Sequence, residues 1–277
     1  MDILSQNWRA TVKRMLPIST VNFIRGLRRP RVNFGDLGGI PISRDWGFDR
    51  GAVIDRYYME RFLTEHQDAV RGRVLEIEHD CYTQKFGSAV THSDVLFVWP
   101  DCPRGKHATI IDDLTTGAKL ETNAYDCIIL TQTLPFIYDL RRAVRTIHRI
   151  LKPGGVVLVT VPSITKVSSD DVNSWGDYWR FTTQSLTRLF EEFFGKSPIT
   201  TQTYGNVQVA SAFLYGLAIQ DLKAGALEQS DPEYPVLIGL RAQKGVTVLS
   251  EPRTVDSVDN EAVLVRAFDG EIYYCNP

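Results

Sequence analysis

Hydrophobic residues recur along the middle of the chain with two different periods. Short runs rich in valine, isoleucine and leucine are typical of strands, and longer stretches with apolar residues three and four apart are typical of helices. Strands are expected at 73–77, 90–94, 108–112, 125–131, 155–162, 200–204 and 234–242. Helices are expected at 52–70, 138–151, 184–194 and 209–222. Because strands and helices alternate, the pattern predicts a doubly wound α/β sheet.

The clearest single unit runs from 125 to 162. Its helix carries an apolar stripe, with arginines off the stripe, so it is expected to pack on a sheet. The stripe consists of Leu140, Val144, Ile147 and Leu151. The sequence KPGG at 152–155 is expected to end this helix, because proline cannot continue it and glycine permits a reversal. The apolar run that follows suits a central strand covered on both faces.

The two ends of the chain differ from this regular middle. We expect a basic N-terminal extension and lid at 1–51, a main domain at 52–244, and a tail or small β appendage at 245–277. The extension either docks on an acidic partner or membrane surface, or packs a few apolar residues on its own domain. The tail is compatible with edge strands, a hairpin or an oligomer arm.

Composition narrows the class of protein. A chain of 277 residues with 43% hydrophobic residues can bury a full core, and a net charge of −2 does not indicate nucleic acid as a partner. No apolar run approaches the roughly 18 residues of a membrane span, and no signal peptide is evident. The four cysteines have no zinc-like spacing, so no metal site is assigned, and we expect reduced thiols in a cytoplasmic protein.

The unit at 125–162 resembles the fourth strand, helix, KPGG turn and fifth strand of class I S-adenosylmethionine-dependent methyltransferases. The segment DYWRFT at 177–182 is similar to one found in bacterial methyltransferases of sugar and envelope-glycan gene clusters. The resemblance covers about 53–243. It implies a Rossmann-like sheet of seven strands, mostly parallel with one antiparallel edge strand, and S-adenosylmethionine bound at the carboxyl ends of the first strands.

The resemblance also implies cofactor-binding residues. Those matched to the family's positions are Glu76, Glu78, Asp94, Asp113, Leu114, Thr131 and Gln132. Among them, Asp94 would accept the ribose hydroxyls, Asp113 the adenine amino group, and Leu114 would pack on the ring. Asp94 and Asp113 have an alternative, since aspartate often caps helices and turns.

The loop after the first expected strand lacks the family's small residues. It carries Glu78, Asp80 and Tyr82 where a dinucleotide-binding turn would place glycines. Acids beside a pyrophosphate argue against NAD and FAD, whereas a cationic cofactor tolerates them. Glu78 either occupies the space of a glycine and cripples the site, or has been recruited to hold the cofactor's ammonium or steer the acceptor.

The acceptor side is expected in the aromatic segment 168–182. Asp177 and, next, His79 are the candidate bases, and Trp175, Tyr178 and Arg180 are the candidate substrate contacts. The alternative is that the aromatic residues anchor the core and Asp177 orients Arg180. We therefore expect O-methylation of a small molecule or glycan. An inactive methyltransferase-like binding or scaffold protein is the alternative, ahead of a nicotinamide-dependent oxidoreductase.

Overall fold

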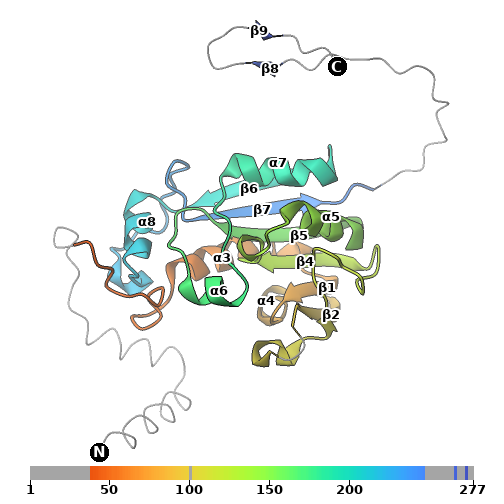
Figure 1. Ribbon diagram of the computed structural model, residues 1–277, viewed down its shortest axis with the longest axis horizontal. Helices are drawn as coiled ribbons and strands as arrows, with labels where there is room; N and C mark the ends of the chain where they lie inside the picture. Colours follow the sequence, from red (N-terminus) through yellow and green to blue (C-terminus); the bar gives the residue numbers. More distant parts are fainter. Residues whose placement is uncertain (1–37, 100–101, 247–264, 267–271, 274–277) are drawn as a thin grey trace, which may run out of the picture. The chain divides into compact units, whose positions relative to one another are not determined.

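A seven-stranded sheet forms the centre of the molecule (Figure 1). The computed structural model describes residues 38–99, 102–246, 265–266 and 272–273. The strand order is β3-β2-β1-β4-β5-β7-β6. Strands β1 to β5 pair in parallel, whereas β7 runs antiparallel to both β5 and β6. The doubly wound, mostly parallel sheet that the sequence predicted is confirmed, and the antiparallel strand β7 lies one position inside the edge strand β6.

The strands are short and the helices flank them in the expected order. The sheet contains β1 (Gly72–Ile77), β2 (Val90–Phe97), β3 (Ile110–Ile111), β4 (Tyr125–Thr131), β5 (Leu151–Pro162), β6 (Ile199–Tyr204) and β7 (Leu237–Gln243). The α-helices are α3 (Ile54–Glu65), α4 (Cys81–Phe86), α5 (Leu140–Ile150), α6 (Ser169–Ser174), α7 (Thr183–Phe194) and α8 (Val207–Leu214). Single 3-10 turns are η2 (Gln67–Ala69), η3 (Pro103–His107), η4 (Leu134–Phe136) and η5 (Ile219–Asp221).

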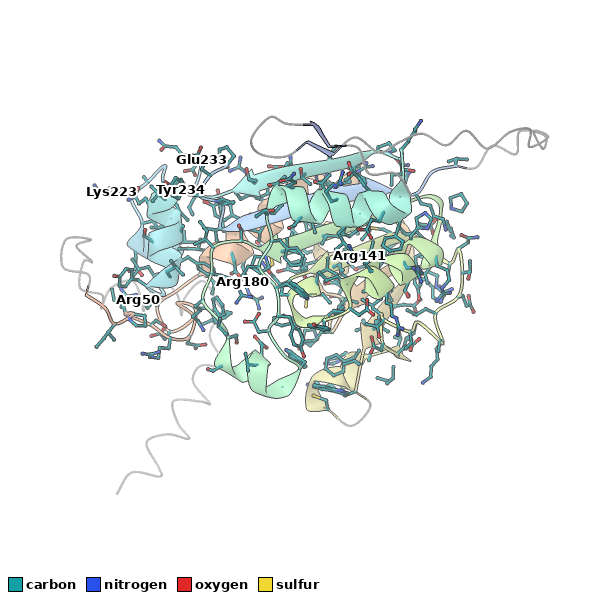
Figure 2. All side chains as sticks on the ribbon, turned by 45° about the horizontal axis from the view of Figure 1, so that its top comes forward. Arg50, Arg141, Arg180, Lys223, Glu233 and Tyr234 are labelled. Atoms are coloured by element: carbon teal, nitrogen blue, oxygen red, sulfur yellow. The ribbon has the colours of Figure 1, made fainter. Side chains whose placement is uncertain are left out.

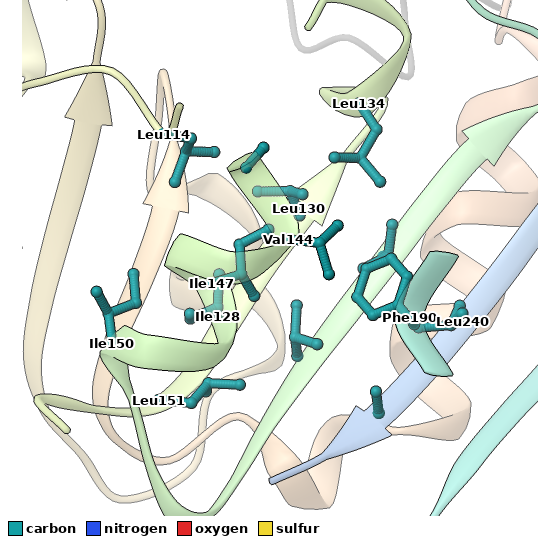
Figure 3. Close-up of a cluster of buried hydrophobic side chains, with 14 of the residues drawn as sticks. Leu114, Ile128, Leu130, Leu134, Val144, Ile147, Ile150, Leu151, Phe190 and Leu240 are labelled. Atoms are coloured by element: carbon teal, nitrogen blue, oxygen red, sulfur yellow. The ribbon is translucent and has the colours of Figure 1, made fainter. Parts of the chain in front are cut away.

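Alternation along the strands divides the core between the two faces of the sheet. On one face, side chains such as Leu75, Ile128 and Leu130 pack against α5 and α7 (Figure 3). On the other face, Val74 and Ile129 pack against α3 and α8. Successive strand residues point to opposite faces, so neighbouring apolar residues enter different layers. Central strands that read as continuous apolar runs are therefore buried on both sides.

Two helix ends differ from the sequence prediction. Helix α5 is capped at its N-terminus by Asp139, whose side chain accepts a hydrogen bond from the backbone amide of Arg142 (3.1 Å). The helix ends at Ile150. The KPGG motif lies inside β5, at a register shift against β4. Helix α8 ends at Leu214, because Gly216 adopts a φ of +68° and its Cα packs against the backbone of Ser43. The prediction of a single long helix at 209–222 is therefore wrong.

The expected extensions are described only in part. Most of the expected basic extension, residues 1–37, lies outside the described residues. Chain contacts divide the protein into two units, Met1–Val246 and Thr247–Pro277. In the second unit, β8 (Val265–Arg266) and β9 (Ile272–Tyr273) pair antiparallel. Within the described residues, no helix is both long enough and apolar enough to cross a membrane.

Candidate functional site

A cavity of about 820 Å³ opens at the carboxyl ends of the parallel strands. This volume lies within the roughly 300–1,000 Å³ typical of small-molecule sites, and the location is the usual one for open α/β sheets. The wall includes strand-end residues Ile77, Phe97, Thr131 and Pro162. Helix α3 and the segment between β5 and α7 complete it.

The turn from β1 into α4 is held by a buried carboxylate. Glu76, 3% exposed, accepts hydrogen bonds from the backbone amides of Tyr82 (3.1 Å) and Thr83 (2.7 Å) and from the Thr83 hydroxyl (2.8 Å). These amides belong to the first turn of α4, where backbone donors lack partners within the helix. Burial nevertheless raises the pKa of Glu76 to about 7. Glu76 therefore shapes the turn and also lines the cavity.

Glu78 occupies the backbone conformation that a glycine would favour. Its φ is +69°, in the left-handed region that costs an L-residue about 1–2 kcal/mol. Both Glu78 and His79 line the cavity, and the imidazole Nε2 of His79 lies 3.7 Å from Oε1 of Glu78. Asp80 does not line it, and its carboxylate instead accepts a hydrogen bond from the Gln84 side chain (2.9 Å). The loop thus keeps its left-handed turn without the small residue.

The placement of Asp94 corrects the sequence prediction. Strand β2 continues through Phe97, so Asp94 lies within the strand and does not line the cavity. Asp94 is 8% exposed, and its carboxylate pairs with the guanidinium of Arg73 (2.8 Å). The end of β2 reaches the cavity through Val98 and Trp99. At this strand end the cavity wall is apolar and aromatic.

The residues expected after β3 and β4 do reach the cavity. Asp113 and Leu114 line it, and Oδ1 of Asp113 accepts a hydrogen bond from the backbone of Thr115 (2.7 Å). Thr131 ends β4, and Gln132 follows with a φ of +49°. The Gln132 amide donates to the carbonyl of Thr160 in β5 (2.8 Å), which fixes this turn to the neighbouring strand.

The segment after α6 contains a tightly bound ion pair. Both carboxylate oxygens of Asp177 accept hydrogen bonds from Arg180 (2.5 and 2.8 Å), and one also accepts from the Ser168 amide (3.0 Å). Burial raises the pKa of Asp177, but the hydrogen bonds from Arg180 and the Ser168 amide, together with the positive charges of Arg180 and Lys166, outweigh burial and lower this pKa. Arg180, labelled in Figure 2, also donates to the carbonyl of Lys166 (2.6 Å). This contact set is the one expected if Asp177 orients Arg180.

The aromatic residues of this segment divide into two groups. Trp175 lines the cavity, stacks on Trp99 with ring centroids 5.3 Å apart, and donates from Nε1 to Asp171 (2.9 Å). Tyr178 is 50% exposed, does not line the cavity, and packs its ring edge-on against Tyr138. Tyr178 is therefore not part of the cavity wall, and its contact with a substrate stays a prediction.

Sequence reasoning missed Asp55 and Arg56 at the start of α3. Both line the cavity, and Oδ1 of Asp55 is buried without a hydrogen-bond partner among the described residues. Burial raises the pKa of Asp55 to about 6. The only available signal was an acid in the first turn of a helix, which is common and usually structural.

Acids outnumber bases on the cavity wall. The acids are Asp55, Glu60, Glu76, Glu78, Asp112, Asp113, Asp171 and Asp177. The arginines and lysines are Arg56, Lys85 and Arg180, and two of these are paired with Glu60 and Asp177. This balance favours a cationic ligand over a pyrophosphate. The described residues contain no group of three or more histidine, cysteine or acidic side chains that could hold a metal ion.

Comparison with known proteins identifies the family of the chain. A family model described as a methyltransferase domain matches residues 40–194, more than half of the chain. The chain belongs to this methyltransferase domain family. It is therefore an enzyme of the methyltransferase class, as the motif at 125–162 predicted. S-adenosylmethionine is the cofactor of this class of enzyme, and the acidic cavity suits its positive charge.

Several solved structures are similar to this chain at low identity. A SAM-dependent methyltransferase from Archaeoglobus fulgidus is 13% identical with a TM-score of 0.46, covering 70% of this chain and 96% of that one. One from Mesorhizobium loti is 12% identical with a TM-score of 0.46, covering 69% and 98%. Phosphoethanolamine N-methyltransferase 2 from Haemonchus contortus, in complex with S-adenosyl-L-methionine, is 13% identical with a TM-score of 0.45, covering 67% and 52%. No curated protein is similar enough to the chain to match.

Because Asp94 pairs with Arg73, we expect its substitution to lower stability, whereas the family resemblance predicted a loss of cofactor binding. Asp94→Asn should lower the free energy of unfolding by about 1–3 kcal/mol, because Arg73 loses a charged acceptor. Its affinity for S-adenosylhomocysteine should stay within about twofold of wild type. Urea denaturation and calorimetric titration measure the two effects. A tenfold loss of affinity in the folded variant would place Asp94 back in the site.

The raised pKa of Asp55 predicts a pH-dependent stability. The folded pKa, about 6, lies above the ordinary aspartate pKa of 3.8, so this group's contribution to stability is fully present below pH 3.8 and is lost as pH rises through 6. Wild type should therefore lose stability relative to Asp55→Asn between pH 4.5 and 7.5, by on the order of 1–3 kcal/mol. Urea denaturation of both proteins at the two pH values measures the difference. A difference that does not change with pH would contradict the burial of this carboxyl.

Proposed function

We propose that this enzyme transfers the methyl group of S-adenosylmethionine to an oxygen atom of a small molecule or glycan. The observation that carries the proposal is the acidic cavity at the carboxyl ends of β1 and β4, with a left-handed turn at Glu78. S-adenosylmethionine, when bound there, supplies a methyl group on a positively charged sulfur. It has no phosphate, so acids in the β1–α4 turn are compatible with it.

The adenosine part is proposed to lie toward β2 and β3. Asp113 has a carboxylate on the cavity wall that can accept from the adenine amino group, and Leu114 offers an apolar surface for the ring. The ribose is proposed to lie against Val98 and Trp99, without the carboxylate that family members place there. Thr131 and Gln132 would border the methionine part, since both lie at the end of β4.

The acceptor is proposed to enter beside the segment that follows α6. Trp175, supported by Trp99, presents an aromatic surface that suits the flat face of a sugar or ring. Arg180 lines the cavity, and its terminal nitrogens already donate to Asp177 and to the carbonyls of Trp179 and Lys166, so it is proposed to attract a polar acceptor group through its positive charge. His79 is the better of the two candidate bases, because both oxygens of Asp177 already accept hydrogen bonds. Its imidazole lines the cavity and is 47% exposed.

Binding measurements separate this function from its alternatives. Calorimetric titration of the full chain with S-adenosylhomocysteine should give a micromolar Kd or tighter, and titration with NADH should show no binding. Absent or millimolar binding of S-adenosylhomocysteine would favour an inactive, methyltransferase-like scaffold protein. Tight NADH binding would favour an oxidoreductase. Neither measurement requires the acceptor to be known.

Glu78 provides a test of the turn itself. Glu78→Gly should raise the free energy of unfolding by about 1 kcal/mol, because glycine adopts a φ of +69° without strain, offset in part by its freer unfolded chain. The same variant should bind S-adenosylhomocysteine more weakly, because a negative charge on the cavity wall is lost. Urea denaturation and titration measure the two effects.

Glu78→Gln is the matched control for this test, because it removes the charge and keeps the side chain's size and backbone strain. It should weaken binding as Glu78→Gly does, without the gain in stability. Tighter binding by Glu78→Gly would show instead that Glu78 only occupies space in the cofactor site. Unchanged binding in both variants would mean that this turn does not contact the cofactor.

A further inference from the structure

One carboxylate on the cavity wall has an oxygen without a partner. Oδ1 of Asp55 is buried and makes no hydrogen bond within the described part of the chain. A buried carboxylate oxygen without a donor is costly, and such groups cluster at functional sites. The other buried carboxylates described above are satisfied: Glu76 by the first turn of α4, Asp94 by Arg73 and Asp177 by Arg180. Asp55 is the exception, and it faces the cavity.

The next residue supplies the opposite charge on the same wall. Arg56 lines the cavity, and its guanidinium lies over the ring of Phe48, 5.3 Å from the centroid. The Arg56 side chain is exposed, and no described carboxylate forms an ion pair with it. The first turn of α3 thus presents a carboxylate and a guanidinium from adjacent residues.

Both groups lie at the β1 end of the cavity. Helix α3 contacts α4 through the ion pair of Glu60 with Lys85 (2.7 Å), and Asp55, Arg56 and Tyr82 line the same cavity. Tyr82 belongs to the first turn of α4, whose amides are held by Glu76. The start of α3 therefore faces the β1–α4 turn, at which a glycine-rich loop would normally approach the ligand.

We propose that the first turn of α3 holds the amino-acid head of the methyl donor, with Asp55 accepting from its ammonium and Arg56 donating to its carboxylate. The inference rests on the proposed function, because the ligand is that methyl donor. An α-amino acid head carries one cation and one anion on neighbouring atoms, which matches the two side chains in charge. A turn occupied by Glu78 offers less backbone approach than glycine, so a second element takes over this contact.

Two ligands that differ only in the amino-acid head test the proposal. S-adenosylhomocysteine carries the head, and 5′-methylthioadenosine retains the adenosine and sulfur without it. Asp55→Asn and Arg56→Gln should each weaken S-adenosylhomocysteine binding by about tenfold or more, because each removes a charged hydrogen-bond partner. Binding of 5′-methylthioadenosine should change by less than about twofold. Calorimetric titration of the full chain measures both.

Glu65→Gln is the matched control, on the same helix but off the cavity wall, with its carboxylate paired to Arg61 (3.1 Å). It should leave the affinity for both ligands unchanged. A loss equal to that of Asp55→Asn would overturn the proposal in favour of a general effect of negative charge. Arg56→Gln keeps the test valid if Asp55→Asn fails to fold, because the Arg56 side chain is exposed.

Three further outcomes are distinguishable. Equal losses of affinity for the two ligands, or no loss for either, would overturn the proposal that Asp55 and Arg56 hold the amino-acid head, while the chain would still bind the cofactor. An unchanged affinity with Asp55→Asn alone would mean that Asp55 acts on the acceptor and does not hold the ammonium. Failure of the wild-type chain to bind either ligand would overturn the proposed function itself, and with it the proposed role of Asp55 and Arg56.

Discussion

The carboxylate of Glu76 joins the end of β1 to the start of α4, and the geometry of the site depends on that connection. Three donors from Tyr82 and Thr83 converge on a side chain that is almost fully buried. They fix the direction in which the chain leaves the sheet, so Glu78 and His79 face the cavity while Asp80 turns away from it. Three hydrogen bonds to one buried side chain help to explain how a left-handed turn persists at Glu78.

Much of the fold was readable from the sequence because its signals are strong and local. Strand β4 was predicted with the correct bounds, since its apolar run is central and buried on both faces. The end of β2 was not, because the acid and serine at 93–94 look like a strand end although the chain stays in the sheet. The early end of α8 depends on the packing of Gly216 against Ser43, residues far apart in the sequence.

The residues of the cavity wall were easiest to predict at the ends of strands. Asp113, Thr131 and Gln132 reach the cavity because the carboxyl ends of parallel strands meet at one edge. Asp94 lies inside β2 and off the cavity wall, because the strand continues past the boundary that the sequence indicated. Asp55 carries no motif, and only the packing of α3 across the sheet brings it to the same edge. The ion pair of Asp177 with Arg180 was foreseen as an alternative role, since arginine three residues away can reach the carboxylate.

The acid-rich wall couples binding to stability. Burial raises the pKa of Asp55 to about 6 and that of Glu76 to about 7, so both carboxyls resist ionisation in the protein alone. A cation placed beside them would favour their charged forms and lower these pKa values. At this end of the cavity, the positive charge of Arg56 lowers the pKa of Tyr82 and the negative charge of Glu60 raises it. The same desolvation that costs the folded protein stability therefore strengthens its attraction for a cation, because charges interact more strongly where water is excluded. A site that holds a sulfonium or ammonium without phosphate contacts needs that attraction, and the buried acids at the β1 edge supply it.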